Sequence, residues 1–348
     1  MRAQQGRERF FALIAILLVV AVIGAVVISM GMGYIKITPV EVLRIIAARL
    51  SGKESLLNGL DQVWPMVVMD VRLPRILTAV IVGAGLAVSG TIFQGILLNP
   101  LADPYTLGIS AGAAFGAALA LLADIAFLGS YSVPIFAFVG AVSTLVVVLR
   151  LSSFDGQMSA NTLILSGVIV GAILAAGLSF IKYVADEQVA VIIFWLMGSF
   201  ASKTWPEVWL VFWCVLVGVG VAIFYGRDLN IMSLGQRSSD SLGVDTARVR
   251  KILLVTASLL AAACVSVSGI IGFIGLIVPH LMRFLVGPDN RKLLPVSLLA
   301  GAVLLLAADT LSRAVLPAEV PVGVLTALIG GPFFCYIFRK RQMGLANG

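Results

Sequence analysis

Long runs of uncharged, mostly apolar residues constrain this sequence more than any other feature. Nine runs have 16 residues or more, at 10–35, 76–102, 104–123, 125–149, 156–181, 208–226, 252–282, 293–308 and 320–338. A helix of about 20 apolar residues crosses the hydrocarbon core of a bilayer. Only 12% of the residues are charged, which is about half the share in soluble domains. The sequence therefore predicts an all-α polytopic membrane protein, with residues 1–348 forming a single transmembrane domain.

The number of spans depends on the run 252–282. Its 31 residues are too many for one untilted helix, and the hydroxyl groups and glycine of Val265-Ser-Val-Ser-Gly269 favour a break. If the run forms two spans, both basic chain ends lie on one side of the membrane, which then has a net charge of +8 against −1 on the other. Basic loops face the cytoplasm. We therefore predict ten transmembrane helices with both termini cytoplasmic.

Three segments lie between the predicted spans, and their position relative to the membrane follows from the same topology. We expect spans at about 10–35, 76–102, 104–123, 125–149, 156–181, 208–226, 250–267, 269–286, 293–312 and 320–338. The segment 36–75 then lies outside, where Thr38 followed by Pro39 has the pattern of a capped helix start. The run 188–202 is short enough to be a helix at the membrane interface. The largest inner loop is 227–251.

The glycines and the missing charges indicate how the spans are used. Gly83, Gly85 and Gly90 place small residues along the second span, which lets neighbouring helices approach closely. The runs contain no Asp, Glu, Lys or Arg, whereas proton-driven transporters usually need ionisable groups within the membrane. His280 has two interpretations, a structural hydrogen-bonding residue at a helix end or a proton relay.

Catalysis and nucleic-acid binding are both disfavoured. The chain has no phosphate-binding loop, no nucleophile–base pair and no spacing typical of metal ligands. We therefore expect no catalytic residue, no metal site and no cofactor bound by this chain. The net charge of +7 reflects membrane topology, because the basic residues lie between apolar runs and form no stripe for nucleic acid.

Several short motifs are spread over nearly the whole chain. They are Arg72-Leu-Pro-Arg75, Gly83-Ala-Gly-Leu-Ala-Val-Ser-Gly90, Gln94, Asn99-Pro-Leu-Ala-Asp-Pro104, Leu107-Gly108, Gly272-Phe-Ile-Gly-Leu-Ile-Val-Pro-His280, Ala308-Asp309, Pro321-Val-Gly323 and Gly330-Gly-Pro-Phe333. Together these motifs resemble those of one family, the FecCD-type permeases of ATP-binding cassette (ABC) importers for iron-siderophores, haem and cobalamin.

The resemblance implies the fold of a type II importer permease in the cytoplasmic membrane of a bacterium or archaeon. It also implies partners: a second permease subunit (the same chain or a sister permease), two cytoplasmic ATPase subunits that bind ATP and Mg²⁺, and a soluble or lipid-anchored substrate-binding protein. The cargo would be a metal chelate. A ferric siderophore is our first expectation, and cobalamin or haem the next.

Three groups of residues match functional positions of that family. Coupling to the ATPase is implied for two short helices in 227–246, with Leu234, Gly235, Ser241, Leu242 and Gly243. A cytoplasmic gate is implied for Asn99, Leu101, Ala160 and Asn161, although relatives carry small hydroxylic residues where this chain has Ala160-Asn161. Docking of the binding protein is implied for Arg72, Arg75 and Arg313, since a guanidinium forms forked bonds with carboxylates.

The sequence also leaves alternatives. Arg72 and Arg75 could instead only anchor a helix at the lipid headgroups. An ion-coupled secondary transporter is the main alternative function, because sodium coupling can use carbonyl and hydroxyl groups. A polytopic membrane enzyme is a third, and would need a polar cluster at one face, with His280 and Asp309 as the residues to test.

Overall fold

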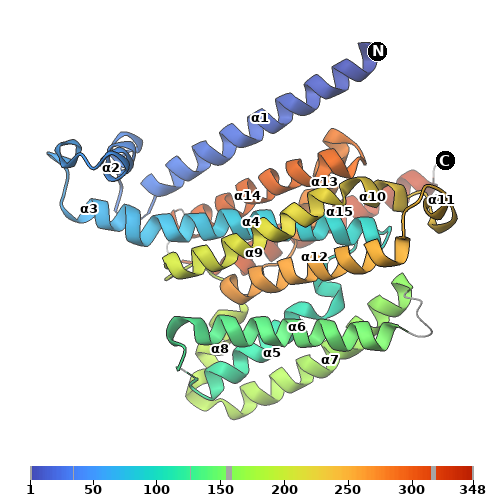
Figure 1. Ribbon diagram of the computed structural model, residues 1–348. Helices are drawn as coiled ribbons and strands as arrows, with labels where there is room; N and C mark the ends of the chain where they lie inside the picture. Colours follow the sequence, from blue (N-terminus) through green and yellow to red (C-terminus); the bar gives the residue numbers. More distant parts are fainter. Residues whose placement is uncertain (1, 34, 126, 154–158, 315–318, 347–348) are drawn as a thin grey trace.

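The computed structural model describes residues 2–33, 35–125, 127–153, 159–314 and 319–346, and within them every regular element is a helix (Figure 1). Seven helical segments are long and apolar enough to cross a membrane. They contain α1 (Arg2–Gly31), α4 (Leu73–Ile96), α6 (Ser132–Ser152), α7 (Ala160–Val184), α9 (Trp205–Phe224), α12 (Thr246–Ser268) and α14 (Asn290–Ala314). The prediction of an all-α membrane fold is confirmed.

Three shorter apolar helices occupy the remaining predicted spans. They are α5 (Ile109–Leu122), α13 (Ile274–Val286) and the apolar part, Val322–Ile337, of α15 (Val322–Ala346). Each of the ten predicted spans thus contains one apolar helix, but the apolar stretch of these three is shorter than a full crossing, and the count of ten stays a prediction. Residues 34, 126 and 156–158 of the predicted spans lie outside the described residues.

The two ends of the helix bundle differ in what they carry. The described chain ends lie on the same side in Figure 1, together with α10 (Gly226–Met232) and α11 (Gln236–Ser241). The helix α2 (Pro39–Ser51) lies at the opposite side. We call these the inner end and the outer end, following the orientation expected from the charges. Chain ends on one side agree with an even number of crossings.

The predicted break in the run 252–282 is confirmed. Helix α12 ends at Ser268 and α13 begins at Ile274. Gly269 between them has φ 72°, and a Cβ there would lie 2.3 Å from the carbonyl oxygen of Trp195. Only glycine tolerates both the left-handed backbone and the close approach, so the chain has to leave the helix at this position.

The second predicted span begins earlier than expected. Short helices α3 (Val63–Met66) and η2 (Val67–Arg72, a π-helical segment) run into α4, so one continuous helical segment extends from Val63 to Ile96. Charged residues at 70, 72 and 75 ended the apolar run in the sequence. They remain helical, and the two arginines among them are bonded to other helices.

Helix α4 forms the centre of the bundle, and its glycines make that possible. A Cβ on Gly83 would lie 2.3 Å from the carbonyl oxygen of Gly301 in α14, and one on Gly90 would lie 1.7 Å from that of Gly275 in α13. Neither contact leaves room for a side chain. The prediction that these glycines permit close helix packing is confirmed.

The remaining elements are short. Thr38 caps α2 with Pro39 in its first turn, as predicted, and Glu41 completes the capping box. The predicted interfacial run 188–202 contains one short helix, α8 (Val189–Leu196). The other short elements are η1 (Glu54–Leu57), η3 (Pro104–Leu107), η4 (Gly129–Tyr131) and η5 (Asp186–Gln188).

Candidate functional site

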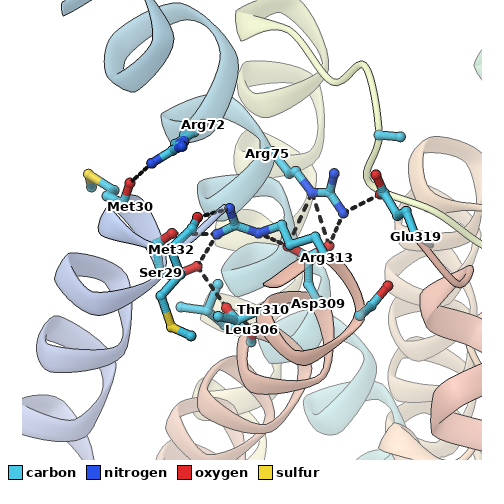
Figure 2. A network of polar contacts seen from close by, with 12 residues as sticks. Ser29, Met30, Met32, Arg72, Arg75, Leu306, Asp309, Thr310, Arg313 and Glu319 are labelled. Carbon is cyan, nitrogen blue, oxygen red and sulfur yellow. Dashed lines mark hydrogen bonds and ion pairs between the residues drawn. The ribbon is translucent and has the colours of Figure 1, made fainter. Parts of the chain in front are cut away.

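Five charged side chains meet at the outer end, and we call them the outer cluster (Figure 2). They are Arg72, Arg75, Asp309, Arg313 and Glu319. Arg75 comes from the first turn of α4, and Asp309 and Arg313 lie one turn apart on α14. The three arginines predicted for docking are therefore brought together, although they are separated by up to 241 positions in the sequence.

Asp309 is the centre of the outer cluster. Its carboxylate is fully buried and accepts from Nη2 of Arg75 at 2.7 Å and from Nε at 3.1 and 3.2 Å. Nε of Arg313 lies 3.4 Å from it on the other side. Nη2 of Arg75 also pairs with Glu319 at 2.6 Å, and Glu319 is 44% exposed. The two guanidinium groups offset the free-energy cost of burying the Asp309 carboxylate, a cost that an isolated buried carboxylate would bear in full.

The other two arginines donate hydrogen bonds to backbone carbonyl groups at the end of α1. Arg72 donates to the carbonyl oxygens of Met30 (2.5 Å) and Ile35, and Arg313 donates to those of Met32 (2.7 Å) and Ser29 (2.5 Å). The last carbonyls of a helix have no partner within the helix, and cations stabilise that end. Arg72 and Arg313 thereby attach the end of α1 to α4 and α14.

This geometry changes what docking would require. Arg72 is only 6% exposed, and the side chains of Arg75 and Arg313 are 13% and 8% exposed. Their guanidinium groups are already bonded within the chain, so a docking protein would have to exchange partners with them. Three arginines face two carboxylates, which leaves one positive charge in excess. The docking role stays a prediction. The alternative of simple headgroup anchoring does not describe these buried contacts.

A second candidate surface, the coupling surface, lies at the inner end on α10 and α11. Leu234 and Leu242 are 62% and 59% exposed. Each is followed by a glycine in the left-handed region, Gly235 with φ 92° and Gly243 with φ 80°. The repeated Leu-Gly pair thus ends each short helix with an exposed leucine. The predicted pair of short helices in 227–246 is present, while their role in coupling is a prediction.

Internal hydrogen bonds hold the coupling surface together. Ser239 is fully buried and donates to the carbonyl oxygens of Ile231 (2.9 Å) and Gly235 (2.8 Å). The hydroxyl of Ser241 donates to the carbonyl of Ser238 at 2.8 Å. The surface thus presents two exposed apolar side chains on a backbone that is held by internal hydrogen bonds.

The predicted gate residues lie at two inner turns. Asn99 accepts a hydrogen bond from the amide of Leu101 (3.0 Å) in the turn after α4. Ala160 and Asn161 open α7 directly after its cap, Ser159. The turn leads into η3, which packs against α7, because a Cβ on Gly167 would lie 2.5 Å from the carbonyl oxygen of Thr106. A gating function for these residues stays a prediction.

Sequence reasoning missed the acidic half of the outer cluster. It recorded Asp309 as part of a motif and as a residue to test for an enzyme, but did not pair it with the arginines, and it did not consider Glu319. One signal was available: Asp309 and Arg313 are four residues apart, so they share one face of a helix. Within the described residues, no group of three His, Cys, Asp or Glu side chains could hold a metal ion.

Comparison with known proteins agrees with this architecture. The FecCD transport family matches residues 14–340. The cobalamin import system permease protein of Halobacterium salinarum is 42% identical over 286 residues, 82% of this chain and 76% of that protein. The Fe(3+)-citrate import system permease protein of Bacillus subtilis is 40% identical over 337 residues, 96% of this chain and 97% of that protein.

A solved structure gives the same result for the fold. It is described as an inward-facing conformation of a metal-chelate type ABC transporter, and it matches with a TM-score of 0.82 and 35% identity, over 94% of this chain and 99% of that chain. The helix arrangement is therefore that of an ABC importer permease, in a multi-pass membrane protein. Sequence motifs, family match and fold lead to one conclusion: the chain belongs to the FecCD transport family.

Proposed function

We propose that this chain is the transmembrane permease subunit of an ABC importer that carries a metal chelate across the cytoplasmic membrane. Two permease subunits enclose the pathway in this scheme. Two ATPase subunits bind ATP and Mg²⁺ and engage the coupling surface, and a binding protein delivers the chelate at the outer end. The chain itself has no ATPase site and binds no cofactor.

The family match over residues 14–340 carries this proposal. Both relatives described above are named for the import of a metal complex. The one that spans 96% of this chain is named for Fe(3+)-citrate, which supports a ferric siderophore as the first substrate to test, with cobalamin and haem next.

The charge distribution supports an external energy source. Asp309 is fully buried within α14, one residue beyond the charge-free run, and is ion-paired with Arg75 and Arg313. A carboxylate that carries protons must alternate between charged and neutral forms. In the proposed scheme Asp309 is instead a structural ion-pair partner of two arginines of the same chain. Ion-coupled secondary transport is therefore the weaker alternative.

The test is transport by a purified complex in liposomes. The permease is reconstituted with its ATPase subunits and binding protein, and uptake of a labelled ferric siderophore is measured with ATP inside or outside, with ADP, and with ionophores. We expect uptake only where ATP reaches the ATPase, with no effect of ionophores. Uptake without ATP that ionophores abolish would replace the proposal with ion-coupled transport. If cobalamin or haem competes with the labelled compound and unlabelled siderophore does not, the substrate assigned here would have to be replaced.

A further inference from the structure

Helix α10 is bonded to the start of α14 through one side chain, Asn230. Its Oδ1 accepts from the backbone amide of Asn290 (2.8 Å) and from Nδ2 of Asn290 (2.9 Å). Its Nδ2 donates to Oδ1 of Asp289 at 2.6 Å. The same Oδ1 of Asp289 accepts from the amide of Arg291 at 3.0 Å. Asn230 therefore takes part in capping α14, although it belongs to a different helix.

The surrounding packing makes this a firm contact. Gly226 of α10 faces α14, and a Cβ there would lie in ordinary van der Waals contact, 3.5 Å from Cδ1 of Leu294. Leu229 is 1% exposed and Asn290 is 6% exposed. Asn290 is buried and Asn230 is half-buried, and the hydrogen bonds between them favour the observed arrangement of the two helices. Helix α10 and the first turn of α14 should consequently move as one unit.

The far end of α14 enters the outer cluster. From Asn290 to Asp309 the helix is continuous and, at 1.5 Å per residue, about 28 Å long. It thus joins the inner end to Asp309 and Arg313. Along its length it contacts α4, where Gly301 and Gly83 leave no space for a Cβ between the two backbones. Closely packed helices shift as rigid bodies rather than bend.

We infer that Asn230 is the residue through which movement of α10 is passed to α14, and that α14 carries the movement to the outer cluster. This inference rests on the proposed function, since it needs an ATPase that moves α10. Asn230 is a positioning residue that acts on α14 through Asp289 and Asn290. A second route exists through α9, which leads directly into α10, and the variants below separate the two routes.

The pair of side chains allows an exchange experiment. Asn230→Asp places two carboxylates where a 2.6 Å hydrogen bond now joins Asn230 to Asp289, and so breaks the contact. Asp289→Asn keeps an acceptor oxygen for both Asn230 and Arg291. In the double variant the amide introduced at position 289 donates to the carboxylate introduced at position 230, which restores the bond between the two helices. The bond from the amide of Arg291 is given up, because one oxygen of Asp289 accepts both bonds in the wild type. A route through α9 alone is indifferent to all three changes.

The measurement is the number of chelate molecules imported per ATP hydrolysed by the reconstituted complex. We expect Asn230→Asp to lower this ratio about fivefold or more, Asp289→Asn to change it less than about twofold, and the double variant to return it to within about twofold of wild type. Lys292→Gln is the matched control, because Lys292 lies in the same turn of α14 but pairs with Glu8 of α1 at 2.5 Å. It should leave the ratio unchanged.

The outcomes separate the inference from the proposed function. A wild-type complex without ATP-dependent uptake overturns both. Uptake by wild type together with an unchanged ratio in Asn230→Asp, or a double variant no better than that single variant, overturns the inference alone. Should Asn230→Asp fail to assemble, Asn230→Ala removes the same hydrogen bonds without adding a charge. An unchanged ratio in Asn230→Ala overturns the inference, and a lowered ratio supports it.

Discussion

The two ends of the bundle differ in whether the side chains predicted to bind other proteins are exposed or already bonded within the chain. At the outer end, three arginines, one buried and two half-buried, are bonded to carboxylates and to backbone carbonyls of the same chain. At the inner end, Leu234 and Leu242 are 62% and 59% exposed in the turns that follow two short helices. The outer cluster thus stabilises the subunit itself, whereas the coupling surface leaves apolar area for another protein. Substitutions should therefore affect stability at the outer end and assembly at the inner end.

Loss of the central carboxylate should have the largest effect on stability. Asp309→Asn leaves Arg75 and Arg313 buried beside a neutral amide, and removal of one partner from a buried ion pair costs about 3–5 kcal/mol. We expect a markedly lower unfolding temperature in detergent. Glu319→Gln is the matched control: it also touches Arg75 but is 44% exposed, so its loss should be about 1 kcal/mol or less. Equal losses in both variants would contradict a central role for Asp309.

At the inner end, the expected defect is in assembly and not in folding. Leu234→Asp combined with Leu242→Asp removes two exposed apolar side chains, and complete burial of one leucine contributes about 1.5–3 kcal/mol. Affinity for the ATPase subunits should fall about tenfold or more, with the unfolding temperature unchanged. Leu50→Asp is the control, because Leu50 is 83% exposed on α2 at the outer end. If it weakens the complex equally, the coupling surface is misassigned.

A docking protein that exchanges partners with the outer cluster should produce a smaller effect, on its own binding affinity. Glu319 and a carboxylate of a docking protein would compete for Nη2 of Arg75, which now pairs with Glu319 at 2.6 Å. Glu319→Gln should therefore raise the affinity for the binding protein severalfold. Glu54→Gln, an exposed change in η1, should have no effect. Unchanged or weaker docking in Glu319→Gln would show that Arg75 is not part of the docking site.

The sequence predicted those features that depend on local chemistry. The apolar runs located the helices, Gly269 and the nearby serines located the break after α12, and Thr38 located the start of α2. In each case the deciding interaction joins residues close in sequence, or excludes every residue but glycine. The two short helices in 227–246 were expected from the family resemblance and not from local chemistry.

The outer cluster could not be predicted in this way. Arg72 and Met30 are 42 positions apart, and Arg75 and Asp309 are 234 apart. Arg75 directly precedes one charge-free run and Asp309 directly follows another, and a search for such runs gives no reason to pair the two. Their burial becomes favourable only after α1, α4 and α14 have packed together. The Asn230–Asp289 contact was missed for the same reason.

The smallest effect should come from a part of the outer end that lies apart from the cluster. Hydrogen bonds from the backbone and hydroxyl of Thr38 hold the pKa of Glu41 below its ordinary value of 4.5. A lowered acid pKa stabilises the capped α2 above pH 4.5, and this contribution is lost as the pH falls through the folded pKa. Amide exchange in 39–51 should be somewhat faster in Glu41→Gln than in wild type at pH 7, and equal in both at low pH. Because α2 contributes no side chain to the outer cluster, the unfolding temperature of Glu41→Gln should match wild type. A lower one would show that α2 and the outer cluster unfold together, and the comparison between the two ends would then have to treat the whole outer end as one unit.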